Sequence, residues 1–70
     1  MTKLSLNNNI FERRYKSLVF LYIPKNDSVI ELSSTIWNRI KNKYSKVNFR
    51  NKLNFKEQEL LVQGILKIDE

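Results

Sequence analysis

The sequence predicts a small α+β domain, in which an antiparallel sheet of two or three strands packs on two or three helices. A six-residue apolar run, Leu18–Ile23, is separated from the strand-like segment 28–32 by the turn-forming residues Pro24 to Asp27. The hydrophobic period then changes to that of a helix over residues 34–44. Seventy residues leave room for only one core.

The N-terminal segment is predicted to lie outside this core. Residues 1–9 are polar, rich in Asn and without a hydrophobic period, so we expect a flexible arm followed by a single domain over residues 10–70. Residues 10–14 are short and fit either a first strand or the tail of the arm. No apolar signal segment follows Lys3 and the longest apolar run has six residues, so we expect a cytoplasmic protein with no membrane span.

Residues 18–23 and 28–32 have the pattern of a β-hairpin, being rich in aromatic and β-branched types on both sides of a turn. Pro24 favours the second position of that turn, and the side chains of Asn26 and Asp27 can bond to their own backbone two residues on. Glu31 alternates with apolar residues and is expected to face solvent.

The following segment, residues 34–44, is predicted to be an amphipathic helix, since its apolar side chains fall within an arc of about 100°. Ser33 or Ser34 supplies the N-cap oxygen, and Lys43 and Lys46 suit the negative end of the helix dipole. The residues that share the apolar face are Ile36, Trp37, Ile40 and Tyr44.

The C-terminal third is more ambiguous. The spacing of apolar residues in 46–53 fits a strand at its start and a short helix at its end. Asn54 and Glu57 resemble a capping box, which predicts a helix over 55–63. Gly64 would end that helix, with residues 65–68 as a strand or extended tail. The alternative is a single strand over residues 60–68.

These elements predict one shared core. We expect it to contain Leu18, Phe20, Tyr22, Ile30, Leu32, Ile36, Trp37, Ile40, Tyr44, Leu61 and Ile65.

The composition excludes most common active sites. The chain has neither Cys nor His, so disulfides, Cys/His zinc sites, thiol nucleophiles and a histidine base are all absent. One Gly cannot form a Gly-rich phosphate loop. Glu57 and Glu59 point about 200° apart on a helix and do not form a facing pair. We therefore expect no enzyme, no metal site and no cofactor.

The charge is strongly asymmetric. The formal net charge is +6, and residues 38–56 contain seven Lys and Arg but no acid. Such a segment can contact phosphates, with Trp37, Tyr44 and Phe49 interleaved, although the helical arc favours burial of the first two. One functional hypothesis is therefore a small nucleic-acid-binding or regulatory protein, of phage or mobile-element origin. Its candidate phosphate-binding residues are Arg39, Lys41, Lys43, Lys46 and Arg50.

The junction from Asp27 to Ile40 resembles the PqqD-like family, in which a strand of the kind "v-x-x-L-N-x-T-a" runs into the first helix of a winged-helix-like fold. Leu32 and Thr35 stand at the matching positions, and Ser33 replaces the usual Asn. The remaining matches are Ile36 and Ile40 on the helix, the preceding strand-like segment 20–24, and Gly64, Ile65 and Leu66 in place of a "G-L-L" that ends the last helix.

The resemblance implies a non-catalytic module that binds an extended, leader-type peptide and presents it to a partner enzyme. The peptide would pair with the strand 28–32 by β-augmentation, in a cleft between that strand and helix 55–63. The residues that the resemblance assigns to this cleft are Val29, Ile30, Leu32, Lys52, Lys56, Leu60 and Leu61. Salt-tolerant binding of one extended peptide distinguishes this hypothesis from nucleic-acid binding.

Overall fold

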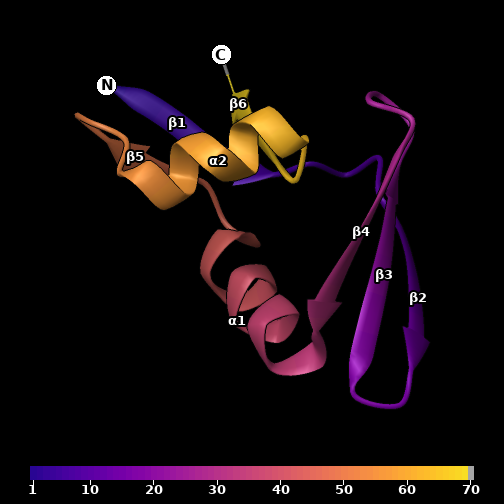
Figure 1. Ribbon diagram of the computed structural model, residues 1–70. Helices are drawn as coiled ribbons and strands as arrows, with labels where there is room; N and C mark the ends of the chain where they lie inside the picture. Colours follow the sequence, from indigo (N-terminus) through magenta and orange to yellow (C-terminus); the bar gives the residue numbers. More distant parts are fainter. Residues whose placement is uncertain (70) are drawn as a thin grey trace.

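The computed structural model describes residues 1–69 and confirms the α+β class (Figure 1). It contains two separate antiparallel sheets of three strands each, ordered β2-β3-β4 and β5-β1-β6, together with two helices. Neither helix is long and apolar enough to cross a membrane. The elements in chain order are β1 (Thr2–Leu6), β2 (Phe11–Tyr15), β3 (Leu18–Ile23), β4 (Ser28–Ser33), α1 (Ser34–Tyr44), β5 (Asn48–Arg50), α2 (Phe55–Gln63) and β6 (Leu66–Asp69).

The sheet β2-β3-β4 contains the predicted hairpin. In the turn between β3 and β4, the N–H of Asn26 donates to the Ile23 carbonyl at 3.2 Å and that of Asp27 to the Pro24 carbonyl at 3.1 Å. Asp27 has φ of +49°, a conformation that Asp tolerates better than most residues. The predicted turn is therefore confirmed, and residues Phe11–Tyr15 form β2, the strand that was one of the two alternatives for residues 10–14.

The prediction of a flexible arm over residues 1–9 is wrong. Residues Thr2–Leu6 form β1, the central strand of the second sheet, and pair with β5 on one side and β6 on the other. Leu4 is completely buried, and the buried Ser5 hydroxyl donates to Asp69 at 2.7 Å. Both partner strands lie in the last third of the chain, so local composition gave no indication of them.

The two helices begin and end as predicted. Ser33 caps α1, its hydroxyl accepting the Ile36 N–H at 3.2 Å. Asn54 and Glu57 form the capping box of α2, and Gly64 ends that helix with φ of +87°. A Cβ at Gly64 would lie 2.9 Å from Ile23 Cγ2, so both conformation and space require glycine.

The ambiguous C-terminal segments are resolved into helix and short strands. Residues Asn48–Arg50 form β5, as expected for the start of 46–53, but the short helix expected at the end of that segment is absent. Residues Leu66–Asp69 form β6. The alternative of one strand over residues 60–68 is wrong, because α2 continues to Gln63.

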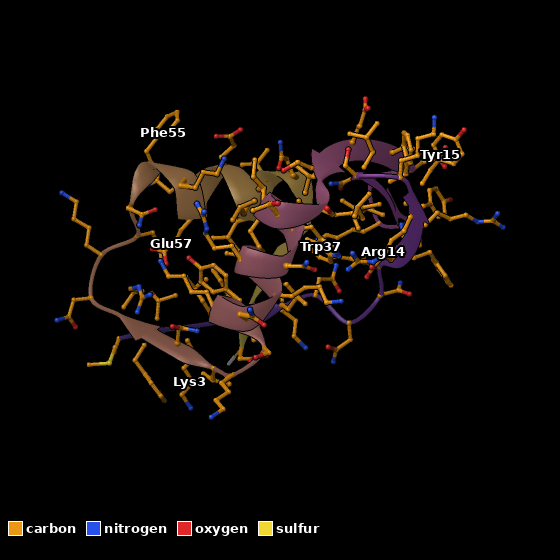
Figure 2. The ribbon with its side chains drawn as sticks, turned by 90° about the horizontal axis from the view of Figure 1, so that it is seen from below. Lys3, Arg14, Tyr15, Trp37, Phe55 and Glu57 are labelled. Carbon is orange, nitrogen blue, oxygen red and sulfur yellow. The ribbon has the colours of Figure 1, made fainter. Side chains whose placement is uncertain are left out.

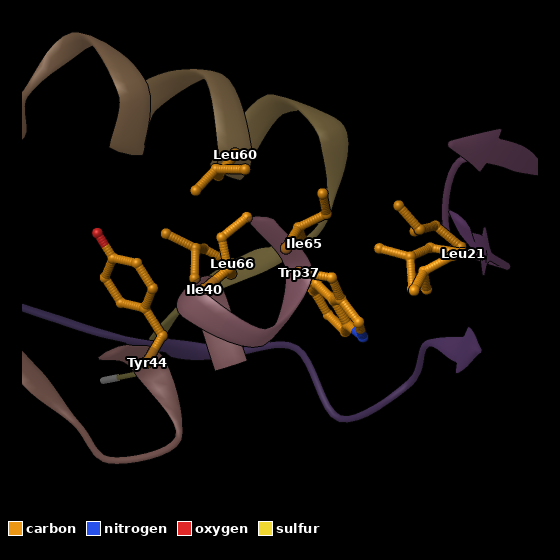
Figure 3. Close-up of a cluster of buried hydrophobic side chains, with 9 residues drawn as sticks. Leu21, Trp37, Ile40, Tyr44, Leu60, Ile65 and Leu66 are labelled. Atoms are coloured by element: carbon orange, nitrogen blue, oxygen red, sulfur yellow. The ribbon is translucent and has the colours of Figure 1, made fainter. Parts of the chain in front are cut away.

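The core lies where α1, α2 and β3 meet (Figure 3). Trp37, Ile40, Tyr44 and Ile65 are buried as predicted. Ile30, Leu32 and Leu61 are partly buried and pack against this cluster. The buried residues that were not predicted in the core are Leu4, Val19, Leu21, Ile23, Leu60 and Leu66.

The predicted orientation of β3 is wrong by one residue. Val19, Leu21 and Ile23 are fully buried, whereas Tyr22 is 40% exposed, and Leu18 and Phe20 are only partly buried on the same opposite face. Since all six residues of β3 are apolar, alternation does not indicate which face is buried. Val19, Leu21 and Ile23 fill the core, and the two aromatic rings of β3 lie outside it.

Ile36 was also expected in the core and is 44% exposed. It lies at the edge of the helical arc whose other members are buried, next to the space between the helices.

Candidate functional site: a basic groove between the helices

A buried polar network joins α1 to α2. Glu57 is only 1% exposed and accepts hydrogen bonds from the Tyr44 hydroxyl at 2.8 Å and from Arg50 Nε at 3.0 Å. Its other oxygen accepts the Asn54 backbone N–H at 3.2 Å. Figure 2 shows Glu57 turned inward from α2 while Phe55, two residues earlier, points away from the molecule. The capping glutamate therefore also fixes the spacing of the two helices.

The network shifts the pKa of both acidic partners. Burial alone raises the pKa of the Glu57 carboxyl, but the bonds from Tyr44 and the Asn54 backbone, with the charge of Arg50, bring it below its usual value. Burial, followed by the bond to Glu57, raises the pKa of Tyr44 to about 12. At neutral pH Glu57 is therefore ionised and Tyr44 is protonated, and neither group is poised to transfer a proton.

Beside this network, α1 and α2 enclose a groove of about 320 Å³. Its floor is apolar and includes the buried side chains of Ile40 and Leu60, with the half-exposed Ile36 at one end. Positions 36, 40 and 44 of α1 lie on one helical face, which turns toward α2. The lining residues are Ile36, Arg39, Ile40, Lys43, Tyr44, Lys56 and Leu60.

The rim of this basic groove is cationic. Arg39 and Lys43 come from consecutive turns of α1, and Lys56 comes from the first turn of α2. None of the three forms an ion pair with an acid of residues 1–69. The groove therefore combines an apolar floor with positive charge that the described part of the chain leaves uncompensated.

Other predicted phosphate-binding residues have different surroundings. Lys41 Nζ lies 3.4 Å from the Glu12 carboxylate and 5.8 Å from the centre of the Trp37 ring, so it links α1 to β2. Arg50 is held by Glu57. Lys46 is exposed in the loop after α1. Only Arg39 and Lys43 of the five predicted residues line the groove.

Of the predicted peptide-binding residues, some line the groove and others lie elsewhere. Lys56 and Leu60 line the groove. Leu61 packs against the core, and Lys52 lies in the loop before α2. The β3–β4 turn contacts the opposite end of α2, where the Asn26 amide donates to the Gln63 carbonyl at 2.9 Å.

The strand residues of the predicted cleft belong to a separate feature. Val29 is 67% exposed on the outer side of the sheet, while Ile30 and Leu32 pack against the core. The structure therefore does not bring these strand residues together with Lys52, Lys56 and Leu60 in one cleft.

β4 is nevertheless an edge strand, as the peptide hypothesis requires. The N–H of Ser34 donates to the Ser17 carbonyl at 2.8 Å, and hydrogen-bonded pairs alternate along an antiparallel ladder. Ile30 and Leu32 therefore bond to β3, whereas Val29 and Glu31 direct their N–H and C=O groups away from it. These groups can accept a further strand.

A second cavity, of about 390 Å³, is a weaker candidate. Its acid, Asp69, already accepts from Ser5 at 2.7 Å and pairs with Lys67 at 3.6 Å, so its charge is satisfied internally. The basic groove, by contrast, was missed from the sequence because Ile36 was assigned to the core. The sequence nevertheless contains a signal. Arg39 and Lys43 are four residues apart, as are Ile36 and Ile40, so a cationic row and an apolar row run side by side along α1.

Comparisons of the chain with family models, with curated proteins and with solved structures found no match. The PqqD-like resemblance and its winged-helix-like topology therefore stay predictions.

Proposed function

We propose that this protein is a non-catalytic module that binds an acidic, extended segment of a partner protein. The observation that carries the proposal is the basic groove, where three cations that form no ion pair within residues 1–69 surround an apolar floor. Carboxylates of the ligand would pair with the rim, and an apolar side chain would cover Ile36 and the floor. The floor is aliphatic apart from the buried Tyr44, which favours an apolar peptide side chain over a nucleobase, because bases stack on exposed aromatic rings.

The free edge of β4 supports the same class of ligand. The backbone groups of Val29 and Glu31 that point away from β3 provide the pairing surface for an extended peptide. Main-chain bonds there are independent of side-chain identity, and no residue of β4 lines the groove, so the preference for acidic and apolar side chains rests on the groove alone.

The proposal is tested with three probes of matched length. They are a peptide of alternating Glu and Leu, poly-glutamate, and a single-stranded oligodeoxynucleotide of mixed sequence. We expect the Glu-Leu peptide to bind about tenfold more tightly than poly-glutamate, since burying one Leu contributes roughly 1.5–3 kcal/mol. Titration is followed by amide chemical shifts of the labelled protein, which also show whether the groove residues respond.

Lys56→Glu is the most informative variant. Lys56 lies in the first turn of α2, where a negative side chain suits the helix dipole, so the variant should keep its fold. We expect it to weaken binding of the Glu-Leu peptide at least fivefold. Lys25→Glu, in the β3–β4 turn outside the groove, makes the same charge change and serves as the control.

Two outcomes contradict the proposal. One is equal loss of peptide affinity in Lys56→Glu and Lys25→Glu, which would show that net charge and not the groove is recognised. The other is preference for the oligonucleotide with an affinity that falls linearly in log–log plots against salt, which is the behaviour of the nucleic-acid hypothesis.

A further inference from the structure

The sheet β2-β3-β4 has an uncovered apolar side, which we call the outer face. Phe11 is 61% exposed, Tyr15 63% and Val29 67%. Contiguous apolar surface of this kind on a small domain marks an interaction site more often than isolated exposed residues do. The apolar side chains that define the outer face are Phe11, Tyr15, Leu18, Phe20, Tyr22 and Val29.

The strand register places these side chains in rows across the sheet. Phe11 pairs with Tyr22, which pairs with Val29, and the first two rings lie 6.2 Å apart. The helices and the second sheet all lie to one side of this sheet in Figure 1, and Figure 2 shows Tyr15 at the periphery, far from α2. Nothing in residues 1–69 covers the outer face.

The middle row carries two opposite charges. Arg13 pairs with Phe20, which pairs with Glu31, so an arginine and a glutamate flank one aromatic ring. Two strand spacings separate them by about 10 Å, and neither forms an ion pair within residues 1–69. A phosphate chain crossing this row would meet Glu31, so the charge balance does not favour nucleic acid here. This charge balance favours a partner that places a negative charge opposite Arg13 and a positive charge opposite Glu31.

We propose that the outer face binds the outer face of a second copy of this chain. A two-fold axis running along β3, between two facing sheets, places β2 of each copy over β4 of the other. Phe20 then meets its own counterpart, and Arg13 of each copy faces Glu31 of the other copy. A two-fold axis across the strands would instead place Arg13 over Arg13, so the charges select the first arrangement.

The size of the face determines how tight this dimer is. Three strands of five or six residues cover about 14 by 17 Å, which is smaller than the roughly 800 Å² per partner of a standard stable interface. We therefore expect a reversible dimer with a dissociation constant in the micromolar range. The basic groove belongs to the opposite side of the sheet and stays accessible.

The test is sedimentation equilibrium of the full chain from micromolar to millimolar concentration at low salt. Arg13→Glu and Glu31→Arg should each weaken the dimer at least tenfold, since each brings two like pairs together. An equimolar mixture of the two variants, and the doubly substituted chain, should both restore it, because both arrangements recreate two opposite pairs. Lys52→Glu, in the loop before α2, should have no effect.

Circular dichroism of each variant establishes that all of them are folded. A chain that is monomeric at millimolar concentration contradicts the proposal. A dimer that neither single reversal weakens, or that the mixture does not restore, contradicts the two-fold arrangement on which it rests. Binding of the mixed-sequence oligonucleotide that is lost in Phe20→Ala would assign the outer face to nucleic acid instead.

Discussion

Tyr44 donates a hydrogen bond of 2.8 Å to Glu57, and this contact between the last residue of α1 and the first turn of α2 sets one wall of the groove against the other. Because Glu57 also accepts from Arg50 and Asn54, one buried carboxylate connects α1, α2 and β5. The stability of the helix pair should consequently follow the protonation states of these two residues.

Glu57→Gln should remove part of the acid sensitivity of the fold. The carboxyl titrates near 4.5 when unfolded and has a lower pKa when folded, so its stabilisation is complete above that pH and is lost as the pH falls through the folded pKa. The variant should lose about 1–3 kcal/mol at neutral pH, where Arg50 loses its anion. Urea unfolding between pH 2 and 7 measures both effects. If the free energy of unfolding decreased toward acid pH as steeply in Glu57→Gln as in the parent, the proposed role of the Glu57 carboxyl would be contradicted.

Tyr44→Phe should make the free energy of unfolding less dependent on pH in the alkaline range. The phenol has a pKa of about 12 when folded against 10 as its reference value, so its stabilisation is present below pH 10 and is lost as the pH rises toward 12. In the parent, stability should fall over this interval, and the variant should show a weaker decrease. Thermal unfolding across this range measures the difference in stability. Because the chain has three tyrosines, the difference in phenolate absorbance between the parent and Tyr44→Phe reports the titration of Tyr44.

Trp37→Ala should cost about 3–5 kcal/mol, which is most of the stability that a chain of this size can have. Trp37 is 2% exposed and lies between α1 and the β3 side chains (Figure 3). Its indole N–H faces the Glu12 carboxylate, a contact that lowers the pKa of Glu12, but the two groups do not reach hydrogen-bond geometry. Trp37→Phe therefore loses volume and this weak polar contact, and it should cost clearly less than Trp37→Ala. Chemical denaturation that ranks the two variants equally would show that packing is not the cause.

Val29→Pro and Ile30→Pro test which residues of β4 direct their N–H groups toward β3 and which direct them toward the free edge. The Val29 N–H points to the free edge, so proline there should leave the fold intact and weaken binding of the Glu-Leu peptide if the peptide pairs with β4. The Ile30 N–H bonds to the buried Leu21, so proline at this position removes a ladder bond and leaves the Leu21 carbonyl without its donor, which should cost about 1–3 kcal/mol. Peptide affinity that Val29→Pro leaves unchanged would exclude β-augmentation on this strand.

How far the sequence predicts this fold depends on how local each signal is. The bounds of α1 and α2 follow from caps within four residues, Ser33 with Ile36 and Asn54 with Glu57, and both helices were predicted correctly. β1 was missed because its partners, β5 and β6, are distant in the chain. The face of β3 was missed because Leu18 and Val19 are equally apolar, and only the position of α1 determines which is buried.

The candidate site was predicted in part for the same reason. The clustering of cations in residues 38–56 is visible in the sequence, but their partners are not. Arg50 and Lys41 were expected on a ligand-binding surface, and tertiary contacts commit them to Glu57 and Glu12. Arg39, Lys43 and Lys56 are left unpaired because no acid approaches the groove from another element of the described chain.

The pairing of β1 with β6 also imposes an order on folding. Ser5 and Asp69, 64 positions apart, meet in this sheet, so β1 has no partner on that side until residues 66–69 have been synthesised. The hairpins of β2, β3 and β4 require only short loops and can form during translation. A chain released before residue 66 would therefore hold one complete sheet and an unpaired edge of β1, ready to pair with another chain.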